Sequence, residues 1–285
     1  MAQIREIKTR IKSVKNIGQI TKAMKMVATA RLKRAQQRIL SARPYAVRMA
    51  DVMKNLAAKT TERDHPLLAV KKEGKSALVV ITADRGLCGS FNANILRQAQ
   101  AYLRENPGTD LITVGKKGRD FFKRRKFNII KEWLYVFPHI PHETVLEMRD
   151  EIEGFFIRGG YKEIRVLYTE FKSVISQKAA MDTLLPIRIQ ELPGEAKGLA
   201  ADYDFEPDLD TILNSLVSQY LATMIHRYLL ESFSSEMGAK RSAMESASKN
   251  AGEMIAKLTL DFNRARQAMI TKELAEIVGG AEALK

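Results

Sequence analysis

Cysteine and proline are both scarce in this chain of 285 residues, and their absences limit what it can be. Cys88 is the only cysteine, so no intrachain disulfide can form and a disulfide-stapled scaffold is excluded. No stretch approaches the roughly 18 apolar residues that a membrane-spanning helix needs. The first residues also lack the apolar segment of a signal peptide, so we expect a reducing, cytoplasmic setting. Proline is absent from residues 1–43 and 208–285, which favours long helices at both ends.

Basic residues outnumber acidic ones, 47 to 33, which gives a formal net charge of +14. Most of the excess lies in residues 1–60, which contain fifteen Lys or Arg against two acidic residues. Residues 208–285 are nearly neutral, with nine basic and ten acidic residues. The basic end therefore predicts an acidic partner, which could be nucleic acid, an anionic membrane or an acidic protein.

Apolar residues recur at helical spacing along both ends of the chain. The first stripe consists of Ile4, Ile7, Ile11, Val14, Ile17, Ile20, Met24 and Val27. The second consists of Met244, Ala247, Ala251, Met254, Leu258, Phe262, Ala265 and Met269. Spacings of three and four residues are typical of a coiled-coil seam, with one irregular step near Ile17. We therefore predict two long terminal helices, over 1–57 and 208–285, that form an antiparallel coiled coil.

Helix geometry predicts how these two helices pair. At 1.5 Å per residue they are roughly 85 Å and 115 Å long, too long for the inside of a globular domain. If the last residue of the first helix lies beside the first residue of the second, next to the domain between them, the residue numbers of each contacting pair sum to about 265. This places Met24 near Arg241 and Ile4 near Asp261, within about a turn. Residues beyond about Asn263 then overhang as a single helix that needs a sheath from another protein.

The middle of the chain has the pattern of an α/β protein. Strands are expected at 76–82, 109–115 and 163–171, and helices near 92–105, 116–126 and 143–158. We expect a Rossmann-like α/β domain over 75–190 and a linker over 191–207, where glycine, proline and aspartate are frequent. The fold class is thus α/β, with two long terminal helices.

The stretch VVITADRGLCGSFNAN (79–94) is the best candidate for a nucleotide site, but it lacks a phosphate-binding signature. Gly86 and Gly89 occur without the third glycine or the lysine of known phosphate loops. We expect a strand, a turn and a helix capped by Ser90 or Asn92. No catalytic, cofactor or metal site is predicted.

The histidines of PHIPHE (138–143) have only a weakly metal-like spacing. His139 and His142 stand among prolines that predict a surface turn, and no cysteine cluster supports them. A structural role is the favoured interpretation.

Three separated blocks of the sequence resemble the γ subunits of F-type ATP synthases. The most specific is ARQAMITKELAEIVGGAEA (265–283), together with the overlapping TLDFNRARQA (259–268). The others are IKSVKNIGQITKAMKMVATARL (11–32) and ITADRGLCGSFNAN (81–94). The resemblance implies a central rotor of the bacterial type, which transmits torque and performs no bond chemistry itself.

The same resemblance implies the partners and the contact residues. The partners are three α and three β subunits, the ε subunit and the c-ring, with no nucleic acid and no insertion into the membrane. The implied location is peripheral, on the cytoplasmic side of the bacterial cell membrane. The implied contacts with the α/β ring are Met24, Lys25, Arg241, Arg266, Gln267, Thr271 and Glu273.

A basic coiled coil that binds nucleic acid is the alternative from another class. Its support is the charge of residues 1–60, which would attract phosphates. Tyr45 is the only aromatic residue there, so a stacking platform for bases is missing. Duplex DNA binding at physiological salt discriminates between the two hypotheses.

Overall fold

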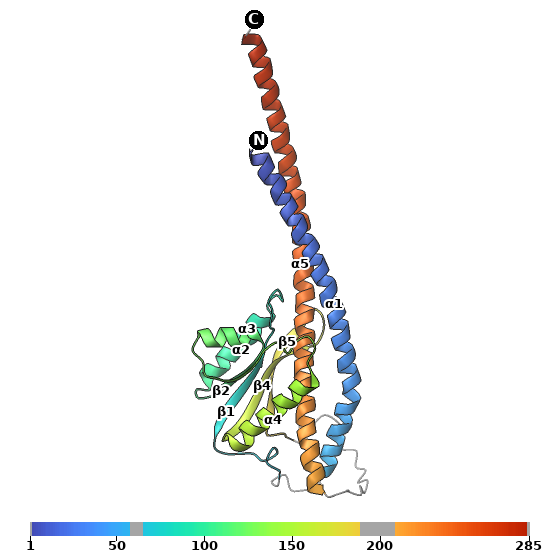
Figure 1. Ribbon diagram of the computed structural model, residues 1–285, viewed down its shortest axis with the longest axis vertical. Helices are drawn as coiled ribbons and strands as arrows, with labels where there is room; N and C mark the ends of the chain where they lie inside the picture. The colour runs from blue at the N-terminus through green and yellow to red at the C-terminus, as the bar shows by residue number, and fades with distance from the viewer. Residues whose placement is uncertain (1, 58–64, 189–208, 284–285) are drawn as a thin grey trace. The chain divides into compact units, whose positions relative to one another are not determined.

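The computed structural model describes residues 2–57, 65–188 and 209–283 (Figure 1). Its contacts divide the chain into two compact units. We call residues 1–28 with 240–285 the coil unit, and residues 29–239 the foot unit. Helix α1 (Ala2–Ala57) and helix α5 (Leu209–Ala283) contribute to both units, so we describe each unit by itself. The predicted linker at 191–207 lies outside the described residues.

The coil unit is an antiparallel pair formed by one end of α1 and one end of α5, as predicted (Figure 1). The seam of α1 differs from the predicted stripe after Val14. Gly18 is half-buried, and Thr21 and Ala28 are only 8% and 1% exposed, whereas Ile17 is 53% exposed. The seam therefore keeps a regular alternation of three and four residues, and the irregular step predicted near Ile17 was wrong.

The register of the coil is about one turn away from the predicted level. Lys25 pairs with Glu245, and a Cβ at Gly18 would lie 3.5 Å from Cβ of Ala251. These pairs sum to 270 and 269, against the expected 265. The foot unit shows a similar offset: Thr223 Oγ1 lies 4.0 Å from Met49 Sδ, and the residue numbers of this pair sum to 272. The end of α1 and the start of α5 are therefore not at the same height along the pair.

The single-helix overhang begins later than predicted. Ala265 and Met269 are still half-buried, whereas every residue from Ile270 to Gly279 is exposed. The one-turn difference in register explains the shift, since it moves the partner of each α1 residue further along α5. The overhang therefore starts at about Ile270 and not after Asn263.

The foot unit contains a five-stranded sheet of order β3-β2-β1-β4-β5. The strands are β1 (Lys75–Ile81), β2 (Asp110–Val114), β3 (Ile129–Trp133), β4 (Tyr161–Phe171) and β5 (Gln177–Leu185). All neighbouring pairs are parallel except β4 and β5, which are antiparallel. The three predicted strands are β1, β2 and β4, whereas β3 and β5 were not predicted.

Helices cover both faces of this sheet (Figure 1). On one face, α2 (Phe91–Glu105) and α3 (Lys116–Arg124) pack on Leu78 and Val80 of β1. On the other face, α4 (His142–Arg158) and the foot parts of α1 and α5 pack on Val79 and Ile81. Alternate side chains of one strand thus serve two separate cores, as the period of a strand requires. The predicted α/β class with a Rossmann-like centre is confirmed.

The stretch at 79–94 makes the strand, turn and helix that its sequence predicts, with Ser90 at the predicted N-cap position. Gly89 has φ +56°, a left-handed conformation that glycine adopts at little cost. Ser90 precedes α2 without a side-chain capping bond. Asn92 lies inside α2, where its Oδ1 accepts a hydrogen bond from Ala83 N (3.0 Å) and its Nδ2 donates to Cys88 Sγ (3.1 Å). The asparagine therefore ties the helix back to the end of β1.

Membrane spans were sought among the described helices. Over residues 2–57, 65–188 and 209–283, no helix has both the length and the apolar character to cross a bilayer.

Candidate partner-contact surface

Three of the predicted contact residues, Met24, Lys25 and Arg241, lie near an ion pair at the end of the coil unit that borders residues 29–239. Lys25 Nζ of α1 donates to Glu245 Oε1 of α5 at 2.7 Å. This hydrogen bond and the charge of Lys25, with a smaller contribution from Arg241, hold the pKa of Glu245 below its usual value. Met24 is half-buried next to this pair. The structure thus brings Lys25 and Arg241 to a common partner that the sequence did not single out.

The other predicted residues lie along the exposed end of α5. Arg266, Gln267, Thr271 and Glu273 are all exposed. Thr271 Oγ1 donates to the Gln267 carbonyl oxygen at 3.0 Å, one turn back along the helix. The predicted contact residues therefore form two separate groups, one at the end of the coil unit that borders residues 29–239 and one near its tip.

A groove lies between the helices near the tip, and sequence reasoning missed it. It has a volume of about 800 Å³. Its apolar residues are Ile4, Ile7, Leu258, Ala265, Ala268 and Met269, and its charged residues are Glu6, Arg10, Asp261, Arg264 and Lys272. Small alanines at seam positions were the available signal, because they fill less of the space between two helices. Ile4 and Asp261 both line the groove, in line with their predicted proximity.

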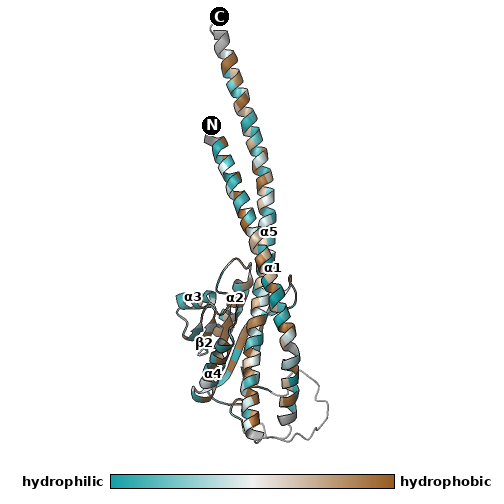
Figure 2. Cartoon of the chain, turned by 45° about the vertical axis from the view of Figure 1, so that its right-hand side comes forward, coloured by the Kyte–Doolittle hydropathy of each residue, from teal (hydrophilic) through white to brown (hydrophobic). Residues whose placement is uncertain are grey.

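Hydrophobic and hydrophilic residues alternate along α1 and α5 (Figure 2), and four of the apolar ones form an exposed group. Its members are Ile17, Ile20 and Val27 of α1 and Met254 of α5, between 51% and 59% exposed. The sequence had placed all four inside the seam. On the surface of the coil they can instead contact a partner, since adjacent exposed apolar side chains favour protein interfaces.

Residues 270–279, which we call the α5 tail, carry a second exposed apolar group. Ile270, Leu274, Ile277 and Val278 are 45% to 67% exposed. An isolated helix of this length is marginal in water, so the tail gains stability from any protein that surrounds it.

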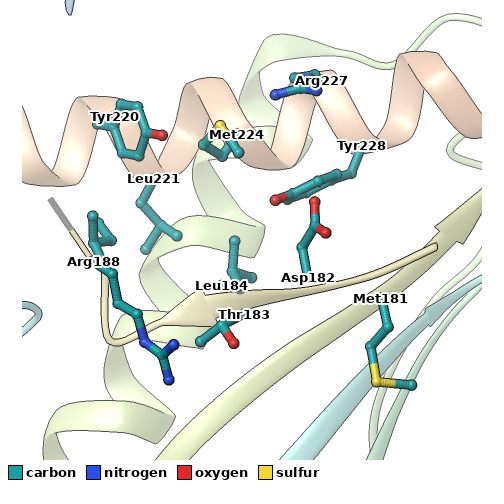
Figure 3. Close-up of a pocket in the computed structure, with 11 residues that line it drawn as sticks. Met181, Asp182, Thr183, Leu184, Arg188, Tyr220, Leu221, Met224, Arg227 and Tyr228 are labelled. Carbon is teal, nitrogen blue, oxygen red and sulfur yellow. The ribbon is translucent and has the colours of Figure 1, made fainter. Parts of the chain in front are cut away.

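The foot unit holds a cavity of about 370 Å³ between β5 and α5 (Figure 3). Asp182 accepts hydrogen bonds there from Tyr168 Oη (3.1 Å) and from Tyr228. Burial, and then the charge of Asp182, raises the pKa of both tyrosines, so both remain protonated donors. Arg188 and Arg227 also line the cavity. Both tyrosines are thus hydrogen-bonded to Asp182, and neither is an activated nucleophile.

The two histidines with metal-like spacing are not brought into a ligand set. The His139 carbonyl oxygen accepts a hydrogen bond from Arg38 (3.3 Å), and His142 is the first residue of α4. Within the described part of the chain, no group of three His, Cys, Asp or Glu residues could hold a metal ion.

The chain matches known proteins over its whole length. The family model described as ATP synthase matches residues 3–284. The ATP synthase gamma chain of Anaeromyxobacter dehalogenans is 46% identical, and the match covers 100% of both chains. The chain belongs to the ATP synthase gamma-chain family.

Solved structures of ATP synthases contain chains with this fold. A chain of the central stalk and c-ring structure of Tetrahymena thermophila mitochondrial ATP synthase is 27% identical, with a TM-score of 0.65 over 80% of this chain and 99% of that one. A chain of the Euglena gracilis mitochondrial ATP synthase has a TM-score of 0.73 over 99% of this gamma-family chain and 95% of its own, at 22% identity. The nucleic-acid alternative finds no support in these comparisons.

Proposed function

We propose that this chain is the central stalk of an F-type ATP synthase. In this role it couples the ion-driven rotation of the c-ring to ATP synthesis or hydrolysis at the catalytic β subunits, by transmitting torque. The membership of the gamma-chain family over the full length supports this function. The chain itself performs no bond chemistry and needs no cofactor.

The single observation that carries the proposal is the exposed end of α5. Residues 270–279 are exposed, yet they include Ile270, Leu274, Ile277 and Val278. In the centre of a protein ring, the surrounding subunits would bury the exposed apolar side chains of this helix. Apolar contacts are not directional, so they also permit turning.

The proposed partners follow from this position. They are three α and three β subunits around the coil, with the ε subunit and the c-ring at the foot. We assign residues 1–57 and 208–285 to the shaft, 75–190 to the foot domain and 191–207 to a linker. The complex is peripheral to the cytoplasmic side of a bacterial membrane. Contact with the ring is assigned to Met24, Lys25, Arg241, Arg266, Gln267, Thr271 and Glu273.

Reconstitution with α and β subunits tests the proposal. We expect a stoichiometric complex that hydrolyses ATP, and no hydrolysis by this chain alone. The variant Leu274→Asp, Ile277→Asp should weaken assembly at least tenfold, because it charges the apolar tail. The matched control Lys272→Asp, Glu276→Asp changes exposed polar residues on the same turns. Failure of the folded wild-type chain to assemble would refute the rotor function.

A further inference from the structure

The layer of the foot formed by α2 and α3 carries a concentration of positive charge. Residues 116–126 include seven basic residues and one acidic residue, Asp120. The basic residues are Lys116, Lys117, Arg119, Lys123, Arg124, Arg125 and Lys126. Five of them are exposed, and exposed Arg85, Arg97 and Arg104 lie in or next to α2. We call this surface the basic layer, and it contains none of the residues assigned to contact with the ring.

Most of these charges have no partner within the described part of the chain. Elsewhere in the foot, basic side chains form ion pairs, such as Lys131 with Glu151 at 2.8 Å. Arg119 is also paired, with Asp120 at 2.7 Å. For Lys117, Lys123, Arg124 and Lys126, the described residues provide neither an ion pair nor a side-chain hydrogen bond. The basic layer is thus uncompensated, which favours binding of an anionic surface.

The backbone at the end of α3 holds Lys126 in a left-handed conformation. Phe127 N bonds to the Phe122 carbonyl (3.2 Å) and Lys126 N to the Lys123 carbonyl (3.1 Å), which is a Schellman motif. The rings of Phe122 and Phe127 pack edge to face at 5.3 Å, as the motif favours. Lys126 occupies its left-handed position with φ +59°, where glycine is usual. A lysine in this conformation costs stability relative to glycine, and it places one more exposed positive charge directly after α3.

The basic layer lacks the features of a protein-binding hot spot. Phe121 and Phe127 are half-buried and Phe122 is buried, so no aromatic anchor is presented between the charges. The Arg125 guanidinium lies 3.7 Å above the Phe121 ring and covers it. The centres of protein interfaces are poor in lysine and rich in exposed aromatic groups. A broad anionic surface fits the basic layer better.

We propose that the basic layer binds the headgroups of anionic phospholipids. The choice of a membrane over nucleic acid rests on the proposed function, which sets the foot beside a membrane. Basic clusters of four to eight residues bind anionic leaflets through screened, exchangeable contacts. Such contacts hold the foot at the surface without fixing its angle, so they are compatible with rotation.

Co-sedimentation of the full chain with vesicles tests this proposal. One set of vesicles contains phosphatidylcholine alone, and the other contains phosphatidylcholine mixed with phosphatidylglycerol. The foot variant carries Lys123→Gln, Arg124→Gln, Arg125→Gln and Lys126→Gln. The shaft control carries Lys8→Gln, Lys12→Gln, Lys15→Gln and Lys22→Gln, four exposed residues of α1 with the same change in charge.

We expect the wild-type chain to bind only the anionic vesicles. The affinity for these vesicles should fall about tenfold in the foot variant and by less in the shaft control. A foot variant that loses no more affinity than the shaft control overturns the proposal. Binding of duplex DNA as tightly as vesicles at the same salt also overturns it. Assembly with α and β subunits is measured separately, so failure of the rotor function is distinguishable.

A second variant separates charge from folding. Lys126→Gly relieves the left-handed lysine and should raise the urea midpoint of the chain while it weakens vesicle binding. A purely structural lysine would show the first change without the second, and that result contradicts the proposal.

Discussion

The coil unit and the foot unit are built on opposite packing principles. The seam of the coil is lined by small residues such as Gly18, Ala28 and Ala251, and the ion pair Lys25–Glu245 is partly exposed. The foot unit buries large side chains completely, among them Phe122, Phe156 and Tyr228. The foot therefore holds its shape through its own core, whereas the coil combines a thin seam with exposed apolar surface. A shaft that works inside a ring needs this combination.

The largest expected effect is in the foot core. Phe156 of α4 is 0% exposed and packs in the core between α4 and the sheet. Phe156→Ala should lower the free energy of unfolding by about 3–5 kcal/mol, because it removes a buried ring and leaves a cavity. Ile157→Ala, at a neighbouring position that is 49% exposed, should cost less than about 1 kcal/mol. Similar urea midpoints for the two variants would argue against an independent foot core.

The coil should respond to a break in one helix. Ala247 is half-buried in α5, and Ala247→Pro removes a backbone hydrogen bond at a cost of about 3 kcal/mol or more. We expect faster hydrogen exchange in residues 11–28, with unchanged exchange in β1 of the foot. The control Ala275→Pro lies in the exposed tail and should leave residues 11–28 protected. Acceleration in β1 as well would show that the two units unfold together.

The coil also shows why apolar periodicity found the helices but misplaced the seam. The stripe was traced through Ile17, the most apolar choice, whereas the closely packed helices accept Gly18 there instead. Thr21 fits the seam because its hydroxyl donates to the Gly18 carbonyl oxygen at 3.0 Å. A strict alternation of three and four residues predicts Gly18, Thr21, Lys25 and Ala28. Hydropathy cannot identify such positions, because helix separation decides which side chains fit.

The foot illustrates a different limit. Strand β5, QKAAMDTLL, has little β propensity of its own, and it is specified by pairing with β4 and by the bond between Tyr168 and Asp182. Strand β3 has only five residues, three of them half-buried. The assignment of Arg266 and Thr271 as contact residues is a prediction from family resemblance, since nothing in a helical pattern separates an exposed contact from an exposed solvated side chain.

An effect of intermediate size is expected for Asp110, whose contribution to the stability of the foot depends on pH. Burial would raise the pKa of Asp110, but hydrogen bonds from Tyr161 Oη (2.7 Å) and Asn128 Nδ2 (2.9 Å), with the charge of Lys75, lower it below the usual 3.8. A lowered folded-state pKa stabilises the fold above pH 3.8, and this contribution is lost as the pH falls through the folded-state value.

Asp110→Asn should therefore destabilise the foot by about 1–3 kcal/mol at neutral pH, with a smaller difference from wild type in acid. Urea unfolding at neutral pH and near pH 3 measures the difference in free energy of unfolding between the variant and wild type under each condition. Asp150→Asn is the control, since its carboxylate is 63% exposed. A difference from wild type that grows on acidification would contradict the assigned role of Asp110.

The smallest effect is expected at the ion pair of the coil. Lys25 and Glu245 are 34% and 57% exposed, so water and salt screen their attraction, and the long side chains lose entropy when they pair. A double-mutant cycle with Lys25→Gln and Glu245→Gln should give a coupling near the detection limit that vanishes in high salt. Arg10 and Glu6, an exposed pair within α1, provide the comparison inside one helix. A large, salt-resistant coupling between Lys25 and Glu245 would mean that this pair, and not the small residues of the seam, sets the register of the two helices.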